Sequence, residues 1–230
     1  VPSPADVLGY SLGERFTPPE DAWRYLRAVD EASDLGELRG YGRTPEGRPL
    51  VQLVLAKPAH RARLDDILAD LRRLQQPGFA ESEANALAAR NPAVVWFSYG
   101  VHGNESSSTD ASIWTAWDIV RGAPTVAGVL DSLIVLIDPM SNPDGRARYV
   151  GWYQQAMGAE PNPNPNAREH WEPWPGGRTN HYMFDLNRDW AFVTQPETRQ
   201  RLASWNYWTP QVHVDFHEMS WASSYFFFPA

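Results

Sequence analysis

Three apolar runs separated by segments with helical periodicity constrain the fold of this chain more than any other feature. The runs cover residues 50–55, 93–99 and 133–137, and each has the length of a buried strand. Residues 20–32 and 61–75 place their apolar side chains on one helical face, with charged residues opposite. Strands that alternate with helices predict an α/β fold, with a mostly parallel or mixed central sheet and helices on both faces as an α/β/α sandwich.

The chain is long enough for one hydrophobic core, so we expect a single domain over residues 1–230. Residues 139–145 are a turn by composition, and residues 151–183, rich in Pro, Asn and Gly, predict a long loop that walls a cleft. A helix near 195–206 and a strand over 211–217 follow.

The charge and the cysteine content exclude several kinds of partner and site. The net charge is −8 without a basic stripe, which argues against nucleic acid and against anionic membrane surfaces as partners. There is no cysteine, so any metal must be held by histidines and carboxylates. Since no apolar run approaches the roughly 20 residues that cross a bilayer, we expect no membrane span.

A candidate metal site follows from the polar residues after two of the strands. His102 and Glu105 stand three residues apart on the turn after a buried strand, and both can reach one ion from the same side. Ser106–Thr109 then offer hydroxyls that could cap the next helix. A catalytic zinc ion typically needs a third protein ligand, and His217 at the carboxyl end of the last strand supplies it. Strand alternation groups the polar residues of that strand on one face: His213, Asp215 and His217.

A lone His-x-x-Glu pair arises by chance in many chains, so other motifs in the same chain are needed to support a metal site. Five motifs occur together, in one order, over roughly residues 20–220. They are Thr44-x-Glu46-Gly47-Arg48-Pro49, His102-x-x-Glu105, Asn142-Pro143-Asp144-Gly145, Asp185-x-Asn187-Arg188-Asp189-Trp190 and Asp215-x-His217. In these motifs the chain resembles the zinc carboxypeptidases of the M14 type.

The resemblance implies roles for named residues. It implies that His102, Glu105 and His217 bind Zn²⁺. Asn187 and Arg188 would hold the terminal carboxylate of the substrate, a task that suits a guanidinium fork beside an amide. Asp185 would be the carboxylate that orients a ligand histidine. Arg178 would be the arginine that stabilises the oxyanion, with Arg146 and Arg148 as alternatives.

The resemblance also implies a catalytic Glu and a substrate-contacting Tyr well beyond the last zinc ligand. We therefore expect both to lie after residue 230, and this chain to lack the C-terminal third of its domain and to be inactive on its own. Glu218 adjoins His217 on the predicted strand, so its side chain should point away from the metal. Residues 225–228, all aromatic, predict the start or end of a core strand.

These observations favour a zinc-dependent metallocarboxypeptidase that hydrolyses C-terminal peptide bonds. One alternative is an amidohydrolase or deacylase that uses the same ligands on a small acylated amino acid. Another is a zinc-containing module that binds peptides without catalysis. The substrate is thus a peptide or a small acylated amino acid, and the family resemblance implies an extracellular or periplasmic location.

Overall fold

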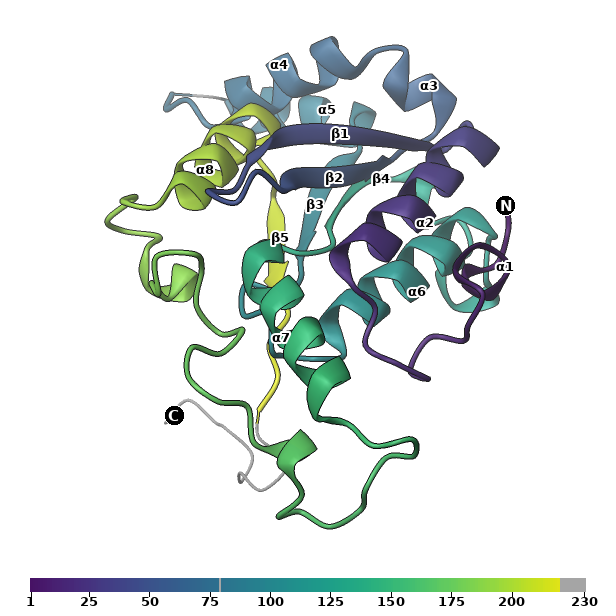
Figure 1. Ribbon diagram of the computed structural model, residues 1–230. Coiled ribbons are helices and arrows are strands. Elements are labelled where there is room, and N and C mark those ends of the chain that lie inside the picture. Colours follow the sequence, from purple (N-terminus) through teal and green to yellow (C-terminus); the bar gives the residue numbers. More distant parts are fainter. Residues whose placement is uncertain (79, 220–230) are drawn as a thin grey trace, which may run out of the picture.

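The structure, a computed structural model, describes residues 1–78 and 80–219, and a mixed sheet runs through its centre. Within this part of the chain the sheet has five strands in the order β1-β2-β4-β3-β5. β3 lies parallel to both β4 and β5, whereas β1 pairs antiparallel with β2, and β2 with β4 (Figure 1). The predicted α/β class is confirmed. The strands are β1 (Gly36–Arg43), β2 (Pro49–Leu55), β3 (Ala93–Ser98), β4 (Leu133–Asp138) and β5 (Val212–Asp215).

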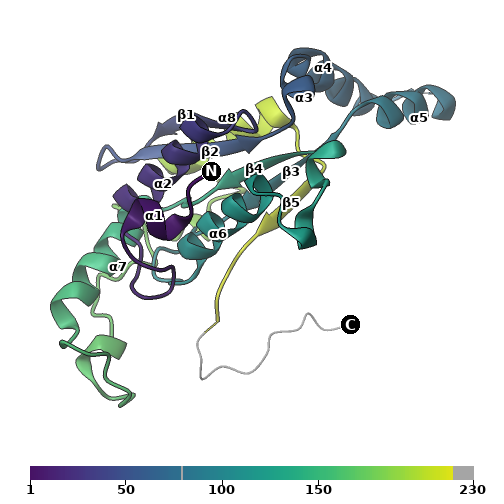
Figure 2. The same ribbon diagram turned by 90° about the vertical axis from the view of Figure 1, so that its right-hand side faces the viewer.

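Helices cover both faces of this sheet (Figures 1 and 2). On one face, α1, α2 and α6 share a core with Leu53, Leu55, Val135 and Ile137 of β2 and β4. On the other face, α4 and α8 pack against the alternate residues of the same strands. The helices are α1 (Pro4–Leu8), α2 (Pro19–Ala32), α3 (Pro58–Arg61), α4 (Leu64–Leu74), α5 (Glu81–Arg90), α6 (Ser108–Val120), α7 (Pro143–Ala156) and α8 (Pro196–Trp208), with short 3₁₀ helices η1 (Pro124–Val126), η2 (Val129–Asp131), η3 (Arg168–His170) and η4 (Leu186–Arg188).

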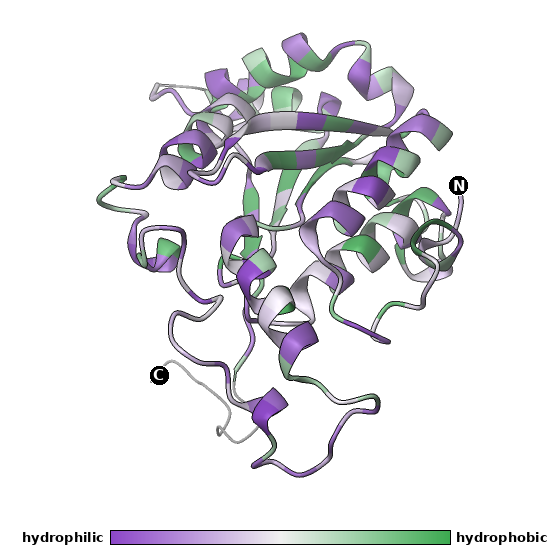
Figure 3. Ribbon diagram, in the orientation of Figure 1, coloured by the Kyte–Doolittle hydropathy of each residue, from purple (hydrophilic) through white to green (hydrophobic). Residues whose placement is uncertain are grey.

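The two cores explain why the strands are continuous apolar runs. In β4, Ile134 and Leu136 face one core while Val135 and Ile137 face the other, so neither face tolerates a polar residue before the strand ends. Figure 3 shows the same arrangement, with apolar residues concentrated on the central strands and polar residues on the surrounding loops and outer helix faces. Polar residues therefore collect where the strands end.

The predicted turn at 139–145 and loop at 151–183 are wrong in part. α7 begins at Pro143 and continues to Ala156, so residues 151–156 are helical. The Asn142 side chain accepts a hydrogen bond from the Gly145 N–H, and Pro143 occupies the first helical turn. Asn-Pro-Asp-Gly has turn composition, but Asn followed by Pro is equally a helix start, and here the second use applies.

The last strand is also shorter than predicted. β5 ends at Asp215, so His217 follows the strand instead of lying on it. The expected strand at residues 225–228 lies outside the residues that the structure describes. Among the described helices, none has the length and apolar character that crossing a membrane requires.

We expect the α2 interface to carry much of the stability. Leu26 is fully buried in the core that α2 shares with α6, so Leu26→Ala should lower the free energy of unfolding by about 2–5 kcal/mol. Its neighbour Arg27 is exposed, and Arg27→Ala should change that free energy by no more than about 0.5 kcal/mol. Urea denaturation followed by circular dichroism measures both, and equal losses in the two variants would contradict the assignment of this face to the core.

Candidate metal centre

Two histidines and one glutamate, from the loop after β3 and the segment after β5, come together. The ligand atoms of His102, Glu105 and His217 all lie within 4.8 Å of one another. His102 Nδ1 is 2.7 Å from Glu105 Oε1, and His217 Nδ1 is 3.2 Å from Glu105 Oε2. Within residues 1–78 and 80–219, no other three His, Asp or Glu side chains form such a group.

The loop that carries His102 and Glu105 is fixed by close backbone packing. It follows β3 and ends at α6, and it passes so near the start of α7 that a Cβ on Gly103 would lie 2.1 Å from the Arg146 nitrogen. The Gly103 N–H donates to the Gly177 carbonyl at 2.8 Å. Glycine is therefore required at position 103, and His102 becomes almost fully buried at 2% exposure.

Each histidine is oriented by a carboxylate behind it. His102 Nε2 lies 2.9 Å from Asp185 Oδ1, and His217 Nε2 lies 3.1 Å from Asp215 Oδ2. A carboxylate accepts the Nε2–H of an imidazole, so Nδ1 is the nitrogen that is available to a metal ion. Both Nδ1 atoms face Glu105: in the metal-free protein a protonated Nδ1 donates to this carboxylate, and a metal ion would take the place of that proton.

The electrostatics of the site are dominated by these contacts. Burial raises the pKa of Glu105, but the hydrogen bonds and charges of His102 and His217 outweigh it and lower that pKa to about 2. Hydrogen bonds to Asp215 and Glu105 raise the pKa of His217 to about 10. For Asp185 burial again raises the pKa, yet the hydrogen bond from His102 and further contacts lower it overall. Glu105 and Asp185 are thus held as carboxylates, and their negative charge favours a cation.

The residues fit a zinc ion on their own chemistry. Two imidazole nitrogens and one carboxylate, with no thiolate, form a known catalytic zinc ligand set that leaves one position open. Ligands bound at about 2.1 Å to one tetrahedral ion lie roughly 3.4 Å apart. The two histidine nitrogens lie 2.7 and 3.2 Å from the Glu105 oxygens, and all three ligand atoms lie within 4.8 Å of one another.

Of the two residues predicted to bind the substrate carboxylate, Asn187 lies beside His217. Asp185 accepts the Asn187 N–H at 2.9 Å and so caps the 3₁₀ helix η4. This places Asn187 Nδ2 3.5 Å from His217 Nε2. The exposed Arg188 follows, and its Nη1 donates to the Asn187 carbonyl.

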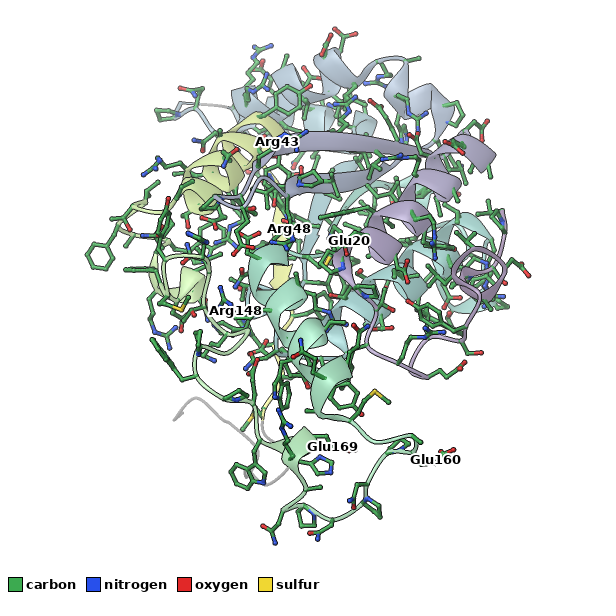
Figure 4. The ribbon with its side chains drawn as sticks, in the orientation of Figure 1. Glu20, Arg43, Arg48, Arg148, Glu160 and Glu169 are labelled. Atoms are coloured by element: carbon green, nitrogen blue, oxygen red, sulfur yellow. The ribbon has the colours of Figure 1, made fainter. Side chains whose placement is uncertain are left out.

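The three arginines proposed for the oxyanion occupy different places. Arg178 donates to Asp185 and brings Nη1 to 3.5 Å from His102 Nδ1. Arg146 is buried and donates to the carbonyls of Thr17 and Ser106. Arg148, on the side of α7 in Figure 4, donates to carbonyls of residues 176–180. Among the described contacts, Arg178 is the arginine that reaches a histidine of the centre.

Glu218 occupies a position that the sequence did not indicate. Because β5 has already ended, the predicted strand alternation does not apply to it. Its carboxylate accepts hydrogen bonds from the N–H groups of Ser107 at 2.6 Å and Ser108 at 3.0 Å. The predicted capping of α6 by its own hydroxyls is therefore wrong, since no side-chain cap comes from Ser107 and the carboxylate supplies the acceptor.

His213, predicted on the same face as His217, lies away from the centre. Its Nε2 is 2.7 Å from Ser98 Oγ, and its ring packs edge-on against Trp205 and Trp190. Asp215 was part of a motif, but sequence reasoning gave it no task. A polar residue two positions before a ligand histidine was the available signal.

Comparison with known proteins supplies a family. The family model described as zinc carboxypeptidase matches residues 23–226. The chain is 25% identical over 141 residues to carboxypeptidase 2 of Trichophyton rubrum, a match that covers 60% of this chain and 21% of that protein.

Solved structures share the fold. Carboxypeptidase A from Helicoverpa armigera superposes with a TM-score of 0.59 at 14% identity, over 94% of this chain and 52% of that one. A metallo-carboxypeptidase from Burkholderia cenocepacia gives a TM-score of 0.53 at 19% identity, over 86% of this chain and 40% of that one. The chain spans about a fifth of the length of the curated relatives that it matches.

The charges of the site predict how the stability of the metal-free protein depends on pH. His217 has a raised pKa, so its contribution is present below its ordinary pKa of 6.5 and is lost as the pH rises toward about 10. Glu105 has a lowered pKa, so its contribution is present above 4.5 and is lost as the pH falls toward about 2. Urea denaturation in EDTA across this range measures both limbs.

A matched pair of variants isolates the alkaline limb. His217→Gln should flatten the decline in stability above pH 6.5, whereas His181→Gln, which changes an exposed histidine outside the centre, should leave it as in the parent. An unchanged alkaline decline in His217→Gln would contradict the contact of His217 with Glu105 and Asp215.

Proposed function

Because the chain belongs to the zinc carboxypeptidase family, we propose that His102, Glu105 and His217 bind one zinc ion at a site that acts on the C-terminal peptide bond of a peptide. The convergence of the three ligand atoms within 4.8 Å supports this most directly. When bound, zinc supplies a Lewis acid that polarises a carbonyl and lowers the pKa of water. An extracellular or periplasmic location stays part of this proposal.

The residues around the ligands would divide the remaining work. Asp185 and Asp215 keep both imidazoles oriented through Nε2, so that the ligand atoms need not reorganise. The Arg178 guanidinium lies beside His102, where it would donate to the oxygen of the scissile carbonyl as negative charge develops there.

Asn187 and Arg188 would bind the free carboxylate at the end of the substrate. Arg188 is exposed and, among the contacts of the described residues, uses Nη1 on the neighbouring carbonyl, so its other guanidinium N–H groups can bind a ligand. The adjacent Asn187 amide lies 3.5 Å from the His217 ring and so connects this clamp to the centre. An arginine fork beside an amide donor recognises a carboxylate through parallel hydrogen bonds.

The carboxylates at the centre are already engaged in other contacts. Glu105 binds both histidines, Asp185 and Asp215 hold one each, and Glu218 caps α6. A general base must be free to accept a proton from water. We therefore propose that the described residues bind zinc and substrate, and that none of these carboxylates is the base.

Metal analysis tests the ligand set. The parent chain should bind one zinc per molecule, and His102→Ala or His217→Ala should abolish stoichiometric binding. Asp215→Asn should keep the stoichiometry but weaken zinc binding by about 10- to 100-fold, because it releases the orientation of His217. His181→Ala serves as the control and should bind like the parent. Full zinc occupancy in His102→Ala or His217→Ala would remove that residue from the site.

Peptide binding to the zinc-loaded chain tests the clamp. We expect a dipeptide analogue with a reduced scissile bond and a free carboxylate to bind at least about tenfold more tightly than its C-terminal amide, since charged hydrogen bonds contribute about 1.5–3 kcal/mol. Arg188→Ala should remove this difference, and Arg188→Lys should restore little of it. Calorimetry measures both. A preference for the free acid that survives in Arg188→Ala would contradict the proposed clamp.

A further inference from the structure

The N-terminal segment with Phe16 and Thr17 lies against the loop that carries His102 and Glu105, which we call the metal loop. This segment precedes residues 23–226, which the family model matches. Thr17 is fully buried, and its hydroxyl donates to Asp110 Oδ1 at 2.6 Å. The Thr17 carbonyl accepts a hydrogen bond from Arg146 Nε. The same guanidinium donates to the carbonyl of Ser106, the residue after Glu105. One buried arginine thus fixes this segment to the loop that carries two ligands.

This attachment places Phe16 in a cluster of aromatic rings on α7. The Phe16 ring centroid lies 5.1 Å from that of Tyr149 and 4.5 Å from that of Tyr153. Trp152 extends the cluster, with its centroid 5.6 Å from that of Tyr149 and 6.2 Å from that of Tyr153. All four side chains are partly exposed, so the cluster presents ring surface to ligands.

Two cavities open on this cluster and share Phe16 and Tyr153. One, of about 350 Å³, reaches Asn104, which stands between the ligands His102 and Glu105 in the chain. The other, of about 570 Å³, reaches Ser106 on the far side of Glu105. We call the two cavities, with Phe16, Tyr149, Trp152 and Tyr153, the aromatic groove. The volume of each cavity is in the range of small-ligand pockets. Each cavity is lined by a residue that is adjacent in sequence to the proposed zinc ligand Glu105.

We propose that the aromatic groove binds the part of a peptide substrate that precedes the scissile bond, and that it favours an aromatic side chain there. This inference rests on the proposed function. If Asn187 and Arg188 hold the terminal carboxylate, the rest of the peptide must leave the centre elsewhere. The cavity residues Asn104 and Ser106 stand on either side of the proposed ligand Glu105 in the chain. A peptide that leaves the centre along this loop therefore reaches the groove.

The chemistry of the groove suits a peptide with a ring. Phe16, Tyr149, Trp152 and Tyr153 offer faces and edges for offset or edge-on contacts with an aromatic side chain. Ser106 and Gln154 on the second cavity can form hydrogen bonds with a peptide backbone. Because Thr17 and Arg146 already fix Phe16, little ordering is needed on binding.

Calorimetry on the zinc-loaded 230-residue chain tests this. The probes are acetyl-Trp-Ala-Gly-Phe, acetyl-Gly-Ala-Gly-Phe and acetyl-Gly-Phe, each with a reduced Gly–Phe bond. We expect the tryptophan peptide to bind about tenfold more tightly than its glycine counterpart, as burial of a large apolar side chain predicts. Phe16→Ala should remove this gain and leave the affinity for acetyl-Gly-Phe unchanged.

Two further variants make the result decisive. Trp152→Ala removes a ring from α7 instead of the N-terminal segment and should reduce the gain, even if Phe16→Ala fails to fold. Tyr182→Ala changes an aromatic residue that is 61% exposed and lines neither cavity, and should keep the gain.

The outcomes separate this inference from the function on which it rests. Equal affinities of the two long peptides for the parent chain, or a gain that survives in folded Phe16→Ala and Trp152→Ala, would overturn the groove and leave the clamp intact. If no peptide binds the zinc-loaded chain, the proposed function fails and the groove fails with it.

Discussion

The parallel pairing of β3 with β5 is the constraint on which the candidate centre depends. Ser98 and Asp215 stand opposite each other at the ends of these strands, so the loop after β3 and the segment after β5 leave the sheet at the same edge. The two cores hold β3 and β4 between helices on both sides, which fixes that edge. The proposed ligands His102 and Glu105, after β3, can then meet the proposed ligand His217, after β5, although the two segments lie more than a hundred positions apart in sequence.

A further set of carboxylates converts this proximity into a defined geometry. Asp185 and Asp215 each hold one imidazole through Nε2, while Glu218 binds the first N–H groups of α6. The helix N-terminus carries partial positive charge, so a carboxylate there both satisfies orphan N–H groups and ties His217 to the segment after Glu105. The segment with His102 and Glu105 and the segment with His217 are thus joined twice, by the contact of His217 with Glu105 and by the hydrogen bonds of Glu218.

Sequence reasoning succeeded where one physical effect dominates. A continuous apolar run such as 133–137 can only be buried on both faces, and β4 follows it within one residue. It failed where the same residues suit two structures, as at Asn142-Pro143, which are as compatible with a turn as with the start of α7. Glu218 could not be placed from sequence, because its hydrogen-bond partners Ser107 and Ser108 lie 110 residues away and only the fold brings them together.

α7 serves the fold and the centre at once, and this explains the crowding around its first turn. Gly145 lies so near Gly177 that a Cβ would stand 2.3 Å from the carbonyl oxygen, and Gly103 approaches the same turn from the metal loop. Arg146 then extends from this turn to the carbonyls of Ser106 and Thr17. A buried guanidinium needs several acceptors to offset its desolvation, and burial indeed lowers its pKa. The N-terminal segment supplies one of these acceptors and is therefore part of what holds the metal loop in place.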